Sequence, residues 1–190
     1  MNEVQLIRQQ LALERQHVGA VAKACAALGA ADAAGSPAGE ALGQFRRACV
    51  DYLACVLAWF EERDQRLAAL LQARSPVADP ARHALEEALA RRGRSRETLA
   101  KLEAACAAST APTGSARQQA WREFGDYFDT AWSARRDAID ALLGAHSRVS
   151  DWRTLGGIDA DSILEERRRY ARVHAQAPPG AALGTPANPD

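Results

Sequence analysis

Charged side chains interrupt the apolar stripes of the expected helices at a similar height, and their types and spacing could support chemistry. Charged residues are rarely buried without a partner, so this coincidence predicts either an Arg–carboxylate network or a cleft open to water. The alternative is that helix rotation turns most of these charges toward solvent. The interrupting residues are Glu14, His17, Arg63, Arg92, Arg96, Arg135, Arg136 and Asp137.

Two segments of similar sequence carry several of these residues. AWFEERDQRLAALL at 58–71 resembles AWSARRDAIDALLG at 131–144, and a constant offset aligns an Ala-Trp pair, an Arg-Asp pair and a leucine stripe. We expect the two segments near the middle of two helices. Helix bundles build their functional sites at mid-height, from side chains that face inward from several helices. The aligned residues include Trp59 with Trp132, Arg63 with Arg136, and Asp64 with Asp137.

Apolar residues spaced three and four apart predict helices over almost the whole chain. The first expected helix spans about 3–30. After a break at 32–39, a second helix of about 34 residues follows, then a third from 80 to about 108 and a fourth over 115–146. Three local signals mark helix starts: Ser36-Pro37, Asp79-Pro80, and a capping box formed by Ser115 and Gln118. A short capped helix over about 161–173 follows a break at Gly156-Gly157.

Four long helices joined by short loops predict an all-α fold, an antiparallel up-down-up-down four-helix bundle over 1–147. Residues 148–176 form an expected C-terminal extension, whose short helix has enough apolar surface to dock on the bundle. The Pro- and Gly-rich composition of 177–190 predicts a disordered tail. Apolar residues of the extension are Trp152, Ile158, Ile163, Leu164, Tyr170 and Val173.

Composition disfavours some classes of partner. The chain has 190 residues, of which 47% are hydrophobic, and its 24 basic residues balance 24 acidic ones. Without a net positive field, binding to nucleic acid or to an anionic membrane surface is disfavoured. The first residues lack the apolar core of a secretory signal, and no run reaches the length of a bilayer span, so we expect a cytoplasmic protein.

Enzymatic motifs are missing from the sequence, and we expect no catalytic activity. The cysteines show no Cys-x-x-Cys spacing and are expected to be reduced core residues. His83, His146 and His174 fall near helix ends or the tail, where a lone His is usually solvated. The Glu-rich stretches ALEEALARR and ILEERRRYARV indicate solvated helix faces with local ion pairs.

Four segments of the chain together resemble the hemerythrin-like (HHE cation-binding) family, in the order of its four helices. They are LERQHVGAV around His17, WFEERDQRL, RRGRSRETLAKLEAA at 91–105, and AWSARRDAIDALL. In that family, a di-iron centre is held by one His from the first helix, His-x-x-x-Glu from the second, His-x-x-x-His from the third and His-x-x-x-x-Asp from the fourth. The resemblance covers about residues 3–146 and implies a bundle of the same kind.

Most of the family's ligand positions carry other residues in this chain. His17 matches the first ligand and Asp137 keeps the carboxylate of the fourth helix. Trp59 and Arg63 stand for the second-helix His and Glu, and Trp132 stands for the fourth-helix His. The third-helix pair falls at Arg92 and Arg96, or one position earlier at Arg91 and Ser95. The resemblance thus implies a rewritten site, in which Arg63 and the third-helix arginines supply positive charge neutralised by Glu14 and Asp137.

Two functions follow from this resemblance. The first is a non-catalytic bundle without metal or cofactor that serves as an interaction or small-ligand-sensing module, with an unknown protein partner or a small anion as its ligand. The second is a divergent di-iron or single-metal protein for oxygen or metal sensing or storage, with iron as its cofactor. The state of association, monomer or homodimer, stays open.

Overall fold

The computed structural model describes residues 3–28, 37–73, 79–107, 114–132, 150–152 and 160–184, and these residues contain helices and no strand. The all-α class is confirmed for this part of the chain. The elements are α1 Glu3–Ala27, α2 Pro37–Ala73, α3 Asp79–Ala107, α4 Gly114–Tyr127, the π-helix η1 Phe128–Trp132, and α7 Ala160–Ala175.

Helix starts follow the sequence signals closely. α2 begins at Pro37 and α3 at Asp79, next to Pro80, because proline's fixed φ suits the first helical turn and its missing N–H has no partner there in any case. The described part of the fourth expected helix divides into α4 and the π-helix η1. Its remainder, 133–146, lies outside the described residues.

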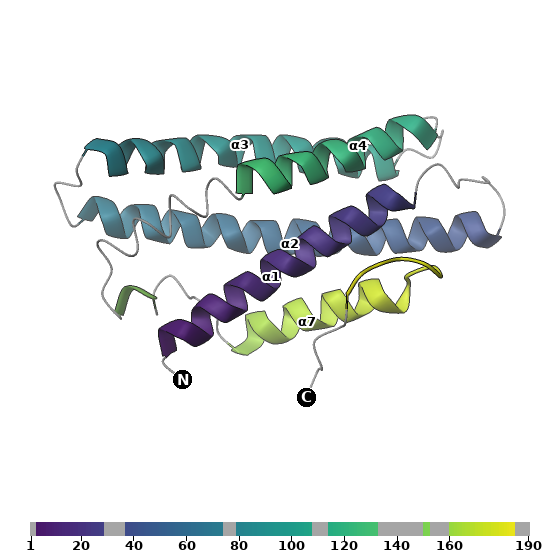
Figure 1. Ribbon diagram of the computed structural model, residues 1–190, viewed down its shortest axis with the longest axis horizontal. Helices are drawn as coiled ribbons and strands as arrows, with labels where there is room; N and C mark the ends of the chain where they lie inside the picture. Colours follow the sequence, from purple (N-terminus) through teal and green to yellow (C-terminus); the bar gives the residue numbers. More distant parts are fainter. Residues whose placement is uncertain are drawn as a thin grey trace.

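The helices are arranged so that α1 and α3 each contact both α2 and α4. Figure 1 shows α2 and α3 lying along each other, with α1 crossing obliquely and α7 on the side away from α3. Chain direction reverses from α2 to α3 and again to α4. α7 packs mainly on α2 and also reaches α1. Three helices therefore meet where α7 lies, and this is where the polar residues described below gather.

The core is formed by side chains of all these helices. The expected stripes supply Val18, Val21 and Cys25 from α1 and Phe45, Cys49, Tyr52 and Val56 from α2, all of them buried. Further buried residues that the sequence reading did not single out are Leu102 from α3, the aromatic residues Trp121 and Phe124 from α4, and Phe128 from η1. Large aromatic side chains bury much apolar area each, and they dominate this core.

The four cysteines carry free thiols, as expected. Cys25 and Cys49 are buried and Cys55 and Cys106 are half-buried. Burial raises the pKa of Cys25 and of Cys55, and burial together with nearby Cys25 raises the pKa of Cys106 to about 11. Because the thiolate is the reactive form, the raised pKa makes Cys25, Cys55 and Cys106 less reactive.

The C-terminal extension packs closely on the other helices. Trp152 is buried beneath the guanidinium of Arg8, whose Cζ lies 4.7 Å from the ring centroid. Tyr170 and Val173 are also buried, whereas Leu164, expected to dock, is 42% exposed. Ile158 lies outside the described residues. None of the helices in the described ranges has both the length and the apolar character needed to cross a bilayer.

The expected disordered tail is corrected for residues 177–184. Leu183 is buried in the core, and its carbonyl oxygen accepts a hydrogen bond from the Tyr170 hydroxyl. Ala181 N–H donates to the Pro178 carbonyl at 3.1 Å, and Gly180 has φ 89°. This fits a type II turn, which favours Pro at its second position and Gly at its third. The composition that indicated disorder instead builds a tight turn; residues 185–190 lie outside the described part.

Candidate functional site

An ion pair between Glu14 of α1 and Arg63 of α2 lies at one end of a buried polar cluster. Arg63 Nη1 lies 2.5 Å from Glu14 Oε2, and Nη2 donates to Oε1 at 3.3 Å. Gln10, one turn earlier on α1, donates to the same Oε1 at 3.2 Å. The side chains of Glu14 and Arg63 are 1% and 11% exposed. Both oxygens of this core carboxylate are thus engaged by protein donors.

His17, one turn after Glu14, belongs to a second group that joins three helices. Its Nδ1 lies 2.9 Å from Oε1 of Glu166 on α7, and the Tyr52 hydroxyl of α2 donates to the same oxygen at 2.7 Å. Glu166 and Tyr52 are fully buried and His17 is 4% exposed. Burial raises the pKa of Tyr52, and the Glu166 carboxylate raises it further. Tyr52 therefore stays protonated and donates to the carboxylate.

Tyr170 and His174 of α7 extend this group by ring contacts. The Tyr170 ring stacks on His17 with centroids 3.8 Å apart and an interplanar angle of 11°, and His174 meets Tyr170 edge-on at 4.7 Å. Burial, with the Glu166 charge, raises the pKa of Tyr170 to about 12. Burial, with neighbouring His17, lowers the pKa of His174. The neutral forms of both rings are therefore favoured.

Some polar atoms of the cluster remain without partners in the described part of the chain. Glu166 Oε2 and His174 Nε2 are buried and make no hydrogen bond there. A carboxylate beside an imidazole and a phenol is a combination that enzymes use for proton transfer. Here His17 and Tyr52 each hydrogen-bond to Glu166 and all three side chains are shielded from solvent, so the arrangement joins α1, α2 and α7.

The structure brings together some of the residues singled out from the sequence. Glu14 and Arg63 form a pair, and His17 lies one turn away in the neighbouring group. Trp59 is half-buried and packs against the core. Arg92 and Trp132 belong to α3 and η1, but their side chains lie outside what the structure describes. Arg136 and Asp137 lie outside the described residues altogether.

Arg96 is a correction, because it does not join the central network. Its side chain is 70% exposed and binds Glu61 of α2 on the outer face of the molecule. The phase of α3 explains this: Ser95 is buried and its Oγ lies 2.9 Å from the Tyr127 hydroxyl, so the next residue along the helix points outward. For this arginine the alternative expectation, rotation toward solvent, holds.

Glu166 and His174 are the residues that the sequence reading placed wrongly. The ILEERRRYARV stretch does form a local i,i+4 ion pair between Glu165 and Arg169, but Glu166 faces the core and His174 is partly buried. The signal was available, because Glu166 lies at helical spacing between Ile163 and Tyr170. It interrupts an apolar stripe in the same way as Glu14 does.

The described residues do not fit a di-iron centre of the hemerythrin-like kind. Both oxygens of Glu14 and the Nδ1 of His17 already have protein partners, and the guanidinium of Arg63 would repel a cation. Across the described ranges, no group of three or more His, Cys, Asp or Glu residues could hold a metal ion. Comparison with protein-family models, with curated proteins and with solved structures finds no match to this chain.

Proposed function

We propose that this chain is a non-catalytic helical binding module, in which protein side chains do the structural work that a metal centre does in hemerythrin-like bundles. We further infer that α1 to α4 form an up-down-up-down four-helix bundle. The contacts of α1 and α3 with both α2 and α4, and the alternating chain direction in Figure 1, support this architecture.

The Glu14–Arg63 pair is the observation that carries the proposal. A metal ion in a bundle core compensates the negative charge of its carboxylate ligands, and here a guanidinium does so at 2.5 Å. The pair is buried, so removal of either partner would leave an unpaired charge in the core. A network of this kind holds helices together without a metal.

The same geometry argues against catalysis and against anion binding by Arg63, the arginine of the buried cluster. Tyr52 and His17 each hydrogen-bond to Glu166 within the core. Arg63 is held by Glu14 in a buried pair. An incoming anion would have to displace the Glu14 carboxylate from Arg63. Recognition is therefore assigned to the outer surfaces of the module.

Metal analysis and thermal unfolding together test this proposal. Protein purified without a chelating tag should contain far less than one metal atom per chain, and a chelator should leave its melting temperature unchanged. Retention of about two iron atoms per chain, with the absorption of an oxo-bridged pair, would support the alternative of a divergent metalloprotein and overturn the proposal.

A further inference from the structure

A cavity of about 180 Å³ opens between α2 and α3, away from the buried cluster. Its lining is mostly apolar, with Leu57 and Leu99 facing each other across it and Ala54 and Ala58 one helical turn apart on α2. Small side chains at these two alanine positions leave the space open. An apolar cavity of about 150 Å³ takes up a benzene molecule, so this one has room for a branched aliphatic or aromatic group.

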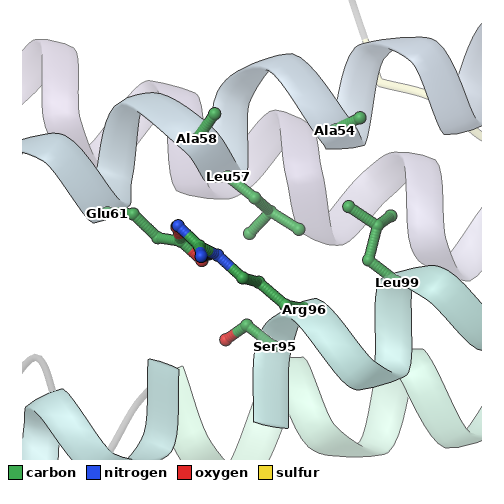
Figure 2. Close-up of a pocket in the computed structure, with 7 residues that line it drawn as sticks. All are labelled: Ala54, Leu57, Ala58, Glu61, Ser95, Arg96 and Leu99. Carbon is green, nitrogen blue, oxygen red and sulfur yellow. Dashed lines mark hydrogen bonds and ion pairs between the residues drawn. The ribbon is translucent and has the colours of Figure 1, made fainter. Parts of the chain in front are cut away.

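Two opposite charges stand at the edge of this cavity. Figure 2 shows Arg96 of α3 reaching across to Glu61 of α2. Arg96 Nε lies 2.8 Å from Glu61 Oε2 and 3.1 Å from Oε1, and Nη2 lies 2.5 Å from Oε2. The Arg96 side chain is 70% exposed, whereas that of Glu61 is 12% exposed. The Arg96 side of this pair lies largely in solvent, where ion pairs stabilise proteins little, so Arg96 can rearrange around a ligand at small cost.

The charge balance of this edge selects the class of ligand. Arg96 and Glu61 sum to zero, so a ligand with a single charge would leave one charge unmatched beside an apolar wall. Arg96 Nη1 makes no hydrogen bond to any described residue and is available to a carboxylate. An ammonium group can bind Glu61 from the same side. A zwitterion with an apolar side group satisfies both charges and fills the space between Leu57 and Leu99.

We propose that this cavity binds a small zwitterion with an apolar side group, of the class of the free apolar α-amino acids. The carboxylate binds Arg96, the ammonium binds Glu61, and the side group enters the cavity. This assignment does not depend on the metal-free character of the module, so either proposal can fail without the other.

Titration of the full chain with L-leucine and L-phenylalanine, followed by amide chemical shifts in NMR spectra, tests the ligand class. We expect saturable shifts in residues lining the cavity. 3-Methylbutylamine and 4-methylpentanoic acid, which each lack one charge of leucine, should bind at least about tenfold more weakly. Glycine, which lacks the side group, should also bind more weakly. No saturable binding of either amino acid, or equal binding of the amine or the acid, overturns the proposal.

Two variants with matched controls test the location. Ala58→Leu fills the cavity from an exposed position and should abolish binding, whereas Ala104→Leu, on an exposed position of α3 outside the lining, should not. Arg96→Gln should weaken binding about tenfold, and Arg94→Gln should leave it unchanged. Circular dichroism melts establish that each variant is folded. If Ala58→Leu does not fold, Arg96→Gln, which changes an exposed side chain, still tests the location of the site. Unchanged binding in a folded Ala58→Leu or Arg96→Gln variant overturns the assignment.

Discussion

Glu14 illustrates how a single buried charge depends on its partner. Its carboxylate has left water almost completely, and Arg63 with Gln10 supplies the hydrogen bonds that it lost. A buried ion pair stabilises a fold little compared with apolar packing, but a broken one is strongly destabilising. The Glu14–Arg63 pair therefore matters most through what happens when one partner is removed.

Glu14→Ala should lower the free energy of unfolding by about 3–5 kcal/mol, because Arg63 would remain buried without its carboxylate. Urea denaturation measures this change. Glu62→Ala, which breaks the exposed pair with Arg66, is the matched control and should cost less than about 1 kcal/mol. The double variant Glu14→Leu/Arg63→Met should be more stable than Glu14→Ala. Similar small effects in Glu14→Ala and Glu62→Ala would contradict the buried pair.

Tyr52→Phe removes one hydroxyl and leaves the ring. The hydroxyl donates to the buried Glu166 carboxylate, and hydrogen bonds to charged groups are worth about 1.5–3 kcal/mol. We expect a loss of stability in that range in denaturant melts. Tyr127→Phe, whose hydroxyl pairs with the neutral Ser95 hydroxyl, should cost about 1 kcal/mol or less. A larger loss in Tyr127→Phe than in Tyr52→Phe would argue against an ionised Glu166.

At the scale of the element, α7 carries a histidine, His174, whose pKa is lowered in the folded chain. Burial, with His17, lowers the pKa of His174 below the value of about 6.5 that an unfolded chain has. As the pH falls below about 6.5, the unfolded chain binds a proton that the folded one resists, so stability present above that pH is lost. His17 of α1, Tyr52 of α2, and Glu166 and Tyr170 of α7 are the titratable groups of this cluster.

His174→Gln should therefore weaken the loss of stability between about pH 7 and pH 5.5. Urea melts at several pH values, compared with the wild type, measure the difference. His83→Gln is a suitable control, because the His83 side chain is 75% exposed and lies on α3. An identical pH dependence in wild type and His174→Gln would show that His174 does not contribute.

Apolar periodicity and capping signals predict the helices well, because both act within a few residues along the chain. Pro37 and Asp79 mark starts that the structure has at the same positions. The buried position of Glu14 also follows from its stripe. The contact of His17 with Glu166 spans 149 residues, and no local pattern specifies which helix face another element will cover. That part of the site needs the tertiary arrangement.

At the scale of the whole molecule, residues 177–184 close the surface over α7. Leu183 lies in the core, and Ala177 and Ala181 pack against it. The Tyr170 hydroxyl donates to the Leu183 carbonyl. The final residues of the described chain are therefore part of the structure that positions Tyr170 on His17.

A chain shortened after Gln176 should lose about 2–5 kcal/mol of unfolding free energy, the range for loss of a buried leucine side chain. Leu183→Ala in the full chain separates the side chain from the rest of the segment and should show most of this loss. Thermal melts of both proteins measure it. Unchanged melting of the shortened chain would show that the segment contributes no stability.

The π-helix Phe128–Trp132 affects how the chain accommodates insertions and deletions. A π turn contains one residue more than an α turn, and one residue rotates later side chains by about 100° around the axis. The Thr130 hydroxyl here donates to the Asp126 carbonyl at 2.6 Å. Deletion of one residue from this segment would leave a regular α-helix, whereas the same deletion between Phe45 and Tyr52 of α2 would turn one of these two side chains away from the core. Insertion or deletion of one residue is therefore more readily absorbed at η1 than in α2.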